Sequence, residues 1–168
     1  MIPEIARVEE LISAQQLQAR VAELGAEISA RYEGSDLTLV GILKGSVPFL
    51  SDLMRAITVP VQIDFLELSS YKGGMESTGA VRLVKDLSHS IADKHVLIVE
   101  DIVDTGLTLK HLNELFEARR PASLAIATLL DKPSGRHHGI DLRVDYAGFT
   151  IPGHFVVGYG LDLGGYFR

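Results

Sequence analysis

The sequence predicts an α/β protein with a central, mostly parallel sheet flanked by helices. Short apolar runs rich in branched residues alternate with longer segments whose apolar residues recur at helical spacing. This alternation of strand and helix is typical of a parallel sheet with helices on its faces. The chain has 168 residues, 46% of them hydrophobic, without an internal repeat or linker, so we expect one domain over 1–168.

The first part of the chain is expected to begin with a helix over 13–32. Ser13 is a good N-cap residue and Gly34 a plausible stop. Four apolar residues recur along this segment at helical spacing: Leu17, Val21, Leu24 and Ile28. The elements that follow are a buried strand, a helix and an alternating strand, at 37–43, 47–57 and 61–68.

Residues 69–80 are polar and contain glycine without periodicity, so we expect a long loop of the kind that often has a function. A strand at 81–87 is expected to pair back with the strand before this loop. The later elements are a strand, a helix, a strand and two strand-like segments, at 95–101, 106–120, 122–130, 141–151 and 155–160. An apolar stripe marks the helix: Leu109, Leu112, Leu115 and Phe116.

Composition and charge exclude several classes of protein. The sequence has no cysteine, so it has no disulfide framework, no Cys-ligated zinc and no thiol nucleophile. Its formal net charge of -6 argues against binding to duplex nucleic acid, which normally requires a basic face. The first residues do not resemble a signal peptide, and no apolar stretch approaches the ~20 residues that span a membrane. We therefore expect a cytoplasmic protein that binds neither nucleic acid nor membrane.

The stretch VLIVEDIVDTGLTL, residues 96–109, places three carboxylates and two threonines at the end of a buried strand. Ligands of open parallel sheets bind beyond the carboxyl ends of the strands. The next helix begins near Gly106, so its first N–H groups and the threonine hydroxyls can bind a phosphate. The carboxylates can bind a sugar diol or hold Mg²⁺ through water. In the alternative interpretation, Asp104 or Thr105 caps the helix and the other two carboxylates are solvated.

Within this stretch, VEDIVDTGLTL is very similar to the phosphoribosyl pyrophosphate-binding motif of type I phosphoribosyltransferases. Further segments narrow the resemblance to the hypoxanthine–guanine phosphoribosyltransferases, in that family's order: GILKGSVPFLSDLMR (41–55), SSYKGG (69–74), LLDKPSGR (129–136) and FVVGYGLDLGGYFR (155–168). The resemblance covers nearly the whole chain. It implies the type I phosphoribosyltransferase fold, with a small hood formed by the N- and C-terminal segments.

The resemblance implies a purine-salvage reaction that joins a 6-oxopurine base to phosphoribosyl pyrophosphate. Pyrophosphate and a purine nucleoside monophosphate would be the products. Cleavage at the anomeric carbon builds positive charge on the ribose and negative charge on the pyrophosphate, so Mg²⁺ or cations, carboxylates and a proton acceptor are needed. The family forms dimers and tetramers, and we expect a homodimer or homotetramer.

By resemblance, Glu100 and Asp101 face the ribose hydroxyls and Mg²⁺. Because neighbouring residues of a strand point to opposite faces, equal roles for the two require the strand to have ended by Asp101. Asp104 matches the general base that takes the purine N7 proton. The rest of the motif matches the cradle of the 5′-phosphate: Thr105, Gly106, Leu107 and Thr108.

Lys44 and Gly45 match a pyrophosphate-binding loop, and the resemblance implies a cis peptide bond between Leu43 and Lys44. Spacing alone instead favours an ordinary turn in which Ser46 caps the next helix.

Ser70 and Tyr71 match a lid, at about 69–80, that closes over pyrophosphate and excludes water. Asp162 matches a carboxylate that holds a second Mg²⁺, and Arg168 matches an arginine that contacts pyrophosphate. The alternative for a terminal arginine is fraying.

Lys132 matches the donor to the purine O6 atom, which would favour hypoxanthine, guanine or xanthine over adenine. The alternative is a surface lysine in a turn. Phe155 matches the aromatic residue that stacks on the base, and Val156 contributes backbone contacts to it. Both residues could instead pack in the core.

Two other functions stay open at this level. A phosphoribosyltransferase fold can serve as a regulator that binds phosphoribosyl pyrophosphate or nucleotides without turnover. A transferase that prefers xanthine is the second alternative.

Overall fold

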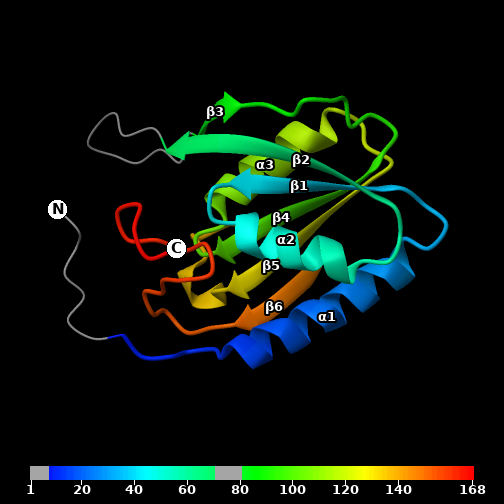
Figure 1. Ribbon diagram of the computed structural model, residues 1–168. Coiled ribbons are helices and arrows are strands. Elements are labelled where there is room, and N and C mark those ends of the chain that lie inside the picture. The colour runs from blue at the N-terminus through cyan, green and yellow to red at the C-terminus, as the bar shows by residue number, and fades with distance from the viewer. Residues whose placement is uncertain (1–7, 71–80) are drawn as a thin grey trace.

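The computed structural model describes residues 8–70 and 81–168, which form a sheet with helices on both faces (Figure 1). The strand order is β3-β2-β1-β4-β5-β6, and each neighbouring pair is parallel except β2 and β3. The strands are β1 (Leu37–Leu43), β2 (Val61–Ser70), β3 (Val81–Lys85), β4 (His95–Val103), β5 (Ser123–Asp131) and β6 (Tyr146–Thr150). The helices are α1 (Ala14–Arg31), α2 (Val47–Ala56), α3 (Leu107–Glu117) and the short 3-10 helix η1 (Pro133–Gly135). The predicted fold class is confirmed.

Helix α1 begins with a capping box, as its sequence predicts. The Ser13 hydroxyl accepts from the Gln16 N–H at 3.2 Å, and the Gln16 side chain accepts from the Ser13 N–H at 2.8 Å. Val21, Leu24 and Ile28 are buried on the face toward the sheet. The helix therefore forms because its cap and its apolar stripe agree.

The two faces of the sheet carry separate cores. Helices α1 and α2 cover the face nearer the viewer in Figure 1, and α3 lies behind the sheet. Neighbouring residues of β4 show the division: Leu97 belongs to the core under α1 and α2, and Ile98 to the core under α3. Strands buried on both faces read as continuous apolar runs, which explains LTLVGIL in β1.

Several predicted boundaries differ from the structure. Strand β4 continues to Val103 instead of ending at Asp101, and β2 includes Ser69 and Ser70, which were expected in a loop. Residues 155–160 were expected to be strand-like, but 155–157 have no regular structure and 158–160 belong to a tight turn. Glycines at positive φ, together with Tyr159 at φ +50°, bend the chain away from extended geometry there.

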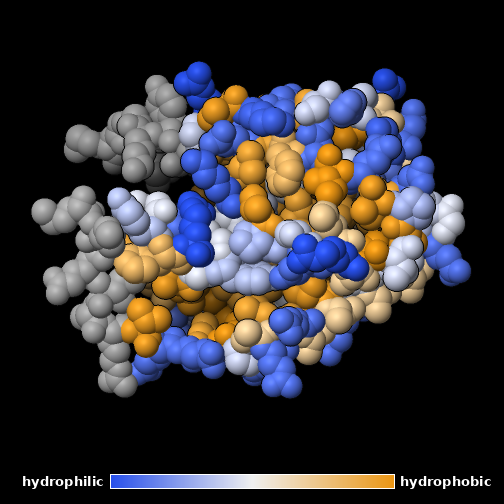
Figure 2. Space-filling model, in the orientation of Figure 1, coloured by the Kyte–Doolittle hydropathy of each residue, from blue (hydrophilic) through white to orange (hydrophobic). Residues whose placement is uncertain are grey.

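The predicted hood is represented by two described segments, 8–12 and 154–163. They line one cavity of about 830 Å³ at the end of the molecule to which the parallel strands point (Figure 1). Hydrophobic side chains gather in a hollow at this end of the face seen in Figure 2. Among the described helices, none is both long and apolar enough to cross a bilayer.

Candidate active site

Three connections leave the carboxyl ends of neighbouring strands and lie side by side. They are residues 44–46 after β1, 104–106 after β4 and 132–136 after β5. The C-terminal segment lies at the same end of the sheet (Figure 1). Because β1, β4 and β5 are adjacent and parallel, residues far apart in the sequence converge here, at the usual ligand position of such a sheet.

Glu100 and Asp101 lie within β4, yet the strand does not direct them by simple alternation. Val99 contacts the core under α1 and α2, and so does Ile102, three residues later, whereas Val103 contacts the opposite core. The ladder with β1 also ends at Val99. The strand does not end by Asp101 but continues to Val103, and its alternation of faces is lost at these two carboxylates.

The Glu100 carboxyl is buried beside Asp101. Its Oε2 atom has no hydrogen-bond partner among the described residues. Burial, and after it the neighbouring Asp101 carboxyl, raises the pKa of Glu100 well above its ordinary value. The alternative in which Glu100 is simply solvated at the strand end is therefore wrong. A buried carboxylate oxygen without a hydrogen-bond partner is costly unless a ligand binds it.

Asp101 packs against the loop after β1. A Cβ atom added to Gly45 would overlap the Asp101 carboxylate, so this carboxylate lies directly against the Gly45 backbone. The Leu43–Lys44 peptide bond is cis, as predicted. Ser46 occupies the N-cap position of α2, as expected, but its side chain makes no cap hydrogen bond: its hydroxyl donates to the Ile42 carbonyl at 2.6 Å. The predicted pyrophosphate loop thus lies against a carboxylate of β4.

Asp104 and Lys132 form an ion pair at the mouth of the site. Lys132 Nζ donates to Asp104 Oδ2 at 2.9 Å, and the Lys132 side chain is only 11% exposed against 48% for Asp104. The interpretation of Lys132 as a surface lysine is therefore wrong. The pair presents a hydrogen-bond acceptor and a donor side by side, with the carboxylate open to solvent.

The N-terminus of α3 is shaped by Gly106. This residue is the N-cap at φ +77°, and no side chain caps the helix. The suggested caps by Asp104 or Thr105 are therefore wrong. The first N–H groups of α3, from Leu107 and Thr108 onward, lack partners within the helix and favour an anion.

Arg136, for which no role was predicted, acts as a clamp that holds the loop after β4 in place. Arg136 donates to the carbonyls of Val103 at 2.9 Å and Asp104 at 2.7 Å, and it pairs with the Asp131 carboxylate. A Cβ on Gly135 would overlap the Asp104 carboxylate. The segment LLDKPSGR contained this signal, but only the fold shows which carbonyls the arginine reaches.

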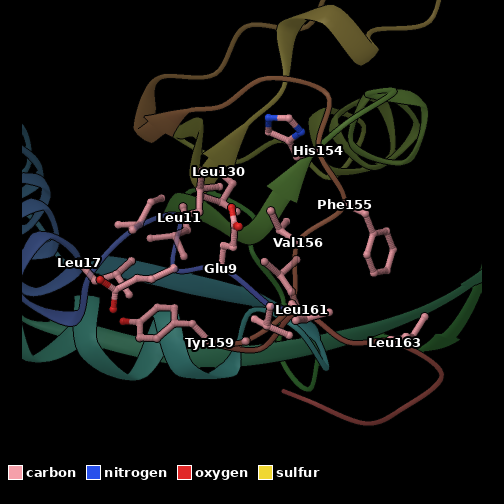
Figure 3. Close-up of a pocket in the computed structure, with 16 residues that line it drawn as sticks. Glu9, Leu11, Leu17, Leu130, His154, Phe155, Val156, Tyr159, Leu161 and Leu163 are labelled. Atoms are coloured by element: carbon pink, nitrogen blue, oxygen red, sulfur yellow. The ribbon is translucent and has the colours of Figure 1, made fainter. Parts of the chain in front are cut away.

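Phe155 and Val156 take different positions in the hood. The Phe155 side chain is 73% exposed, and its ring points away from the cavity, while Val156 points into it and packs against the core (Figure 3). Core packing is thus wrong for Phe155 and confirmed for the Val156 side chain. An exposed aromatic ring at this end of the sheet is available to stack on a flat ligand.

Asp162 and Arg168 form an ion pair, with Arg168 Nη2 2.7 Å from Asp162 Oδ1. The Asp162 carboxylate also accepts from the Gly165 N–H at 2.5 Å, and Arg168 donates to the Gly160 carbonyl at 2.5 Å. Arg168 is therefore held by specific contacts. The two residues predicted on the pyrophosphate side lie together, each partnered by the other.

Comparison with known proteins assigns the family. The model of the phosphoribosyl transferase domain matches residues 7–163. The chain belongs to the phosphoribosyltransferase family. The hypoxanthine phosphoribosyltransferase of Salmonella typhimurium is 49% identical to this phosphoribosyltransferase over 163 residues, which are 96% of this chain and 90% of that protein.

Two further proteins agree with this assignment. The hypoxanthine-guanine phosphoribosyltransferase of Bacillus subtilis is 46% identical over 158 residues, covering 94% of this chain and 87% of that protein. The structure of a hypoxanthine phosphoribosyltransferase from Staphylococcus aureus matches with a TM-score of 0.90 and 49% identity, covering 95% of this chain and 86% of that one.

The lid predicted for this phosphoribosyltransferase includes Ser70 and Tyr71. Ser70 ends β2, whereas Tyr71 and the rest of the lid, through residue 80, lie outside the described residues. The lid therefore stays a prediction.

The metal ligands predicted for this phosphoribosyltransferase are all carboxylates. Within 8–70 and 81–168, no three side chains of the His, Cys, Asp or Glu type form a closed metal cluster. Mg²⁺ typically keeps several waters and binds one or two carboxylates together with substrate phosphates. The Glu100 and Asp101 pair, with its orphaned buried Oε2, fits such a partial site.

Proposed function

We propose that this phosphoribosyltransferase transfers the 5-phosphoribosyl group from phosphoribosyl pyrophosphate to hypoxanthine, and also to guanine. The products are pyrophosphate and IMP or GMP. The named relatives support this reaction class. The observation that carries the choice of base is the Asp104–Lys132 pair, whose atoms lie 2.9 Å apart.

The pair matches one edge of a 6-oxopurine. N7 and O6 are neighbours on that edge, so a base protonated at N7 offers a donor beside an acceptor. Asp104 accepts from N7–H, and Lys132 donates to O6. Lysine has donors only, so the 6-amino group of adenine finds no acceptor on it and leaves a buried polar contact unpaired. Phe155 stacks on the base, and the Val156 backbone contacts it.

The transfer then needs no covalent intermediate with the protein. The bond from the anomeric carbon to pyrophosphate breaks, purine N9 bonds to that carbon, and the N7 proton passes to Asp104. The 5′-phosphate binds the α3 N-terminus with the Thr105 and Thr108 hydroxyls, where the helix dipole favours its charge. Fixing the phosphate at one end and the base at the other aligns the reacting atoms.

The charged groups of the donor bind the remaining residues. Glu100 and Asp101 accept from the ribose hydroxyls, and Lys44 and Gly45 receive the pyrophosphate. We propose Mg²⁺ as the cofactor, held by Glu100 and Asp101 and, on the pyrophosphate side, by Asp162. When bound, the ion offsets negative charge that develops on the leaving group.

A steady-state assay tests the proposal. Hypoxanthine, guanine, xanthine, adenine and uracil are each offered with phosphoribosyl pyrophosphate and Mg²⁺. Turnover of hypoxanthine and guanine, with adenine and uracil at least about 10³-fold lower in kcat/KM, is expected from the unpaired polar contact. Turnover of no oxopurine would contradict the proposed transferase activity, and a dominant activity on xanthine would contradict the proposed preference for hypoxanthine and guanine.

A further inference from the structure

A turn of the hood lies directly on the loop that we assign to pyrophosphate. Gly158 and Leu161 bond each other through both backbone N–H groups, at 3.0 and 3.2 Å, and so close a tight turn. Within it, Gly160 faces the loop after β1. A Cβ atom on Gly160 would overlap the Gly45 carbonyl oxygen, so the two backbones are in direct contact.

One side chain of this turn reaches the neighbouring helix. The Tyr159 hydroxyl donates to Asp52 Oδ2 of α2 at 2.5 Å, across 107 residues of sequence. Tyr159 holds φ +50°, a conformation that side chains rarely adopt, so the turn must be maintained by its contacts. The same helix begins directly after the Lys44–Gly45 loop. The hydrogen bond therefore ties the turn and the loop to one rigid element.

The residues beyond the turn carry charges predicted to face pyrophosphate. Asp162 follows directly, and Arg168 donates to the Gly160 carbonyl while it pairs with Asp162. A shift of the turn would thus move Asp162 and Arg168 relative to Lys44. Burial, and then the Asp52 carboxylate, raises the pKa of Tyr159, so the hydroxyl keeps its proton and remains a donor at neutral pH.

We propose that the Tyr159–Asp52 hydrogen bond is a positioning device that sets the pyrophosphate half of the site and leaves the nucleotide half unaffected. This inference rests on the proposed function. Tyr159 touches no substrate; it acts through the turn at 158–161. The nucleotide half, at the α3 N-terminus and the Asp104–Lys132 pair, is held by the separate Arg136 clamp.

The test compares Tyr159→Phe with the native protein in both directions of the reaction. KM for pyrophosphate and for phosphoribosyl pyrophosphate should rise about tenfold. Loss of a hydrogen bond to a charged group would misplace the protein residues that bind these two substrates. KM for IMP, which contains no pyrophosphate, should stay within about twofold. Tyr146→Phe, a half-buried tyrosine on β6, is the matched control and should resemble the native protein.

Asp52 variants separate positioning from general stability. Asp52→Asn retains an oxygen that can accept from Tyr159 and should keep native KM values, whereas Asp52→Ala should match Tyr159→Phe. The double variant Tyr159→Phe with Asp52→Ala should be no worse than either single change. Because Asp52 is 38% exposed on α2, Asp52→Ala also tests the idea should Tyr159→Phe fail to fold.

Two results would overturn the inference. One is an unchanged KM for pyrophosphate in both Tyr159→Phe and Asp52→Ala. The other is an equal rise for IMP and pyrophosphate, which would mean that the hydroxyl only supports the fold. If the native protein turns over no oxopurine, the proposed function itself fails, and the two failures are thereby distinguished.

Discussion

At the scale of single residues, the site depends on charged groups that are each placed against one partner. Asp104 lies beside Lys132, and Asp101 beside Gly45. Glu100 differs, because one of its carboxylate oxygens is buried without a partner among the described residues. Substitution of the partnered Asp104 should therefore impair the protein, whereas substitution of the unpartnered Glu100 should stabilise it.

Replacing Asp104 with asparagine should impair chemistry much more than binding. The amide still accepts a hydrogen bond from Lys132, but it cannot take the purine proton. We expect kcat to fall by about 10²–10⁴, the usual contribution of a general base, with KM for phosphoribosyl pyrophosphate changed by less than about threefold. Steady-state kinetics measures both quantities. The exposed Asp141→Asn is the control, and near-native kcat in Asp104→Asn would exclude the residue as the base.

Replacing Glu100 with glutamine should stabilise the substrate-free protein at neutral pH. Its pKa is raised in the folded state, so above the ordinary glutamate pKa this group makes folding less favourable than a residue that does not titrate would. Native stability should therefore rise as pH falls from 8 toward the ordinary glutamate pKa, as the folded protein binds a proton more readily than the unfolded chain does.

The measurement is urea unfolding of native protein and Glu100→Gln between pH 5 and pH 8. We expect a gain of about 1–3 kcal/mol in the free energy of unfolding at pH 8, because glutamine keeps a polar group at this buried place but removes the cost of ionisation, and a smaller gain at pH 5. Glu114→Gln, on the exposed face of α3, should show neither. A gain that grows on acidification would contradict a raised pKa of Glu100 in the folded protein.

At the scale of elements, the end of β4 is held by the turn after β5. The strands pair in register from His95 with Ser123 to Val103 with Asp131, and the Lys132 N–H donates to the Val103 carbonyl at 2.9 Å. The turn then folds back, and Arg136 reaches the same loop. Residues 131–136 therefore fix the position of Asp104, the predicted general base, and of the loop predicted to bind the phosphate.

Gly135→Ala tests whether the turn after β5 positions Asp104. The added methyl group would overlap the Asp104 carboxylate and displace it from Lys132. A displacement of about 1 Å at a catalytic group can cost about 100-fold, so we expect kcat to fall between about tenfold and about 100-fold. Gly153→Ala is the control, since a Cβ there would meet nothing within 4 Å. Equal, small effects of the two changes would show that the turn does not position Asp104.

At the scale of the whole molecule, the site brings together four segments that lie far apart in the sequence. The loops after β1, β4 and β5 and the hood all meet where the parallel strands end (Figure 1). A ligand that touches all of them couples them, so its binding should raise the stability of the entire fold.

Phosphoribosyl pyrophosphate with Mg²⁺ should therefore raise the melting temperature. At 100 times its Kd the expected gain is about 2.7 kcal/mol, or roughly 5–10 °C for a chain of this size. Scanning calorimetry with Mg²⁺ and with EDTA measures the contribution of the metal. Removal of Mg²⁺ should abolish most of the shift, because the pyrophosphate charge then faces Glu100, Asp101 and Asp162 directly. An equal shift in EDTA would contradict the role of the metal.

The sequence predicted elements best where local signals agreed. The cap of α1, the apolar stripes and the apolar strands all depend on residues within a few positions of each other, so α1, β1 and α3 were expected within a few residues of their bounds. Residues 155–160 were predicted wrongly because their branched and aromatic residues favour a strand, whereas glycines at positive φ impose turns. The site residues were found by family resemblance, not by spacing alone.

The sequence by itself determined the fold class, the strand that bears the carboxylates and the glycine that opens the α3 N-terminus. These features follow from periodicity and backbone preference, which act locally. Only the tertiary structure decided that Lys132 lies against Asp104, that one oxygen of Glu100 is buried, and that Tyr159 reaches Asp52. Each depends on strand register and on packing between residues distant in the chain, and no local pattern contains that information.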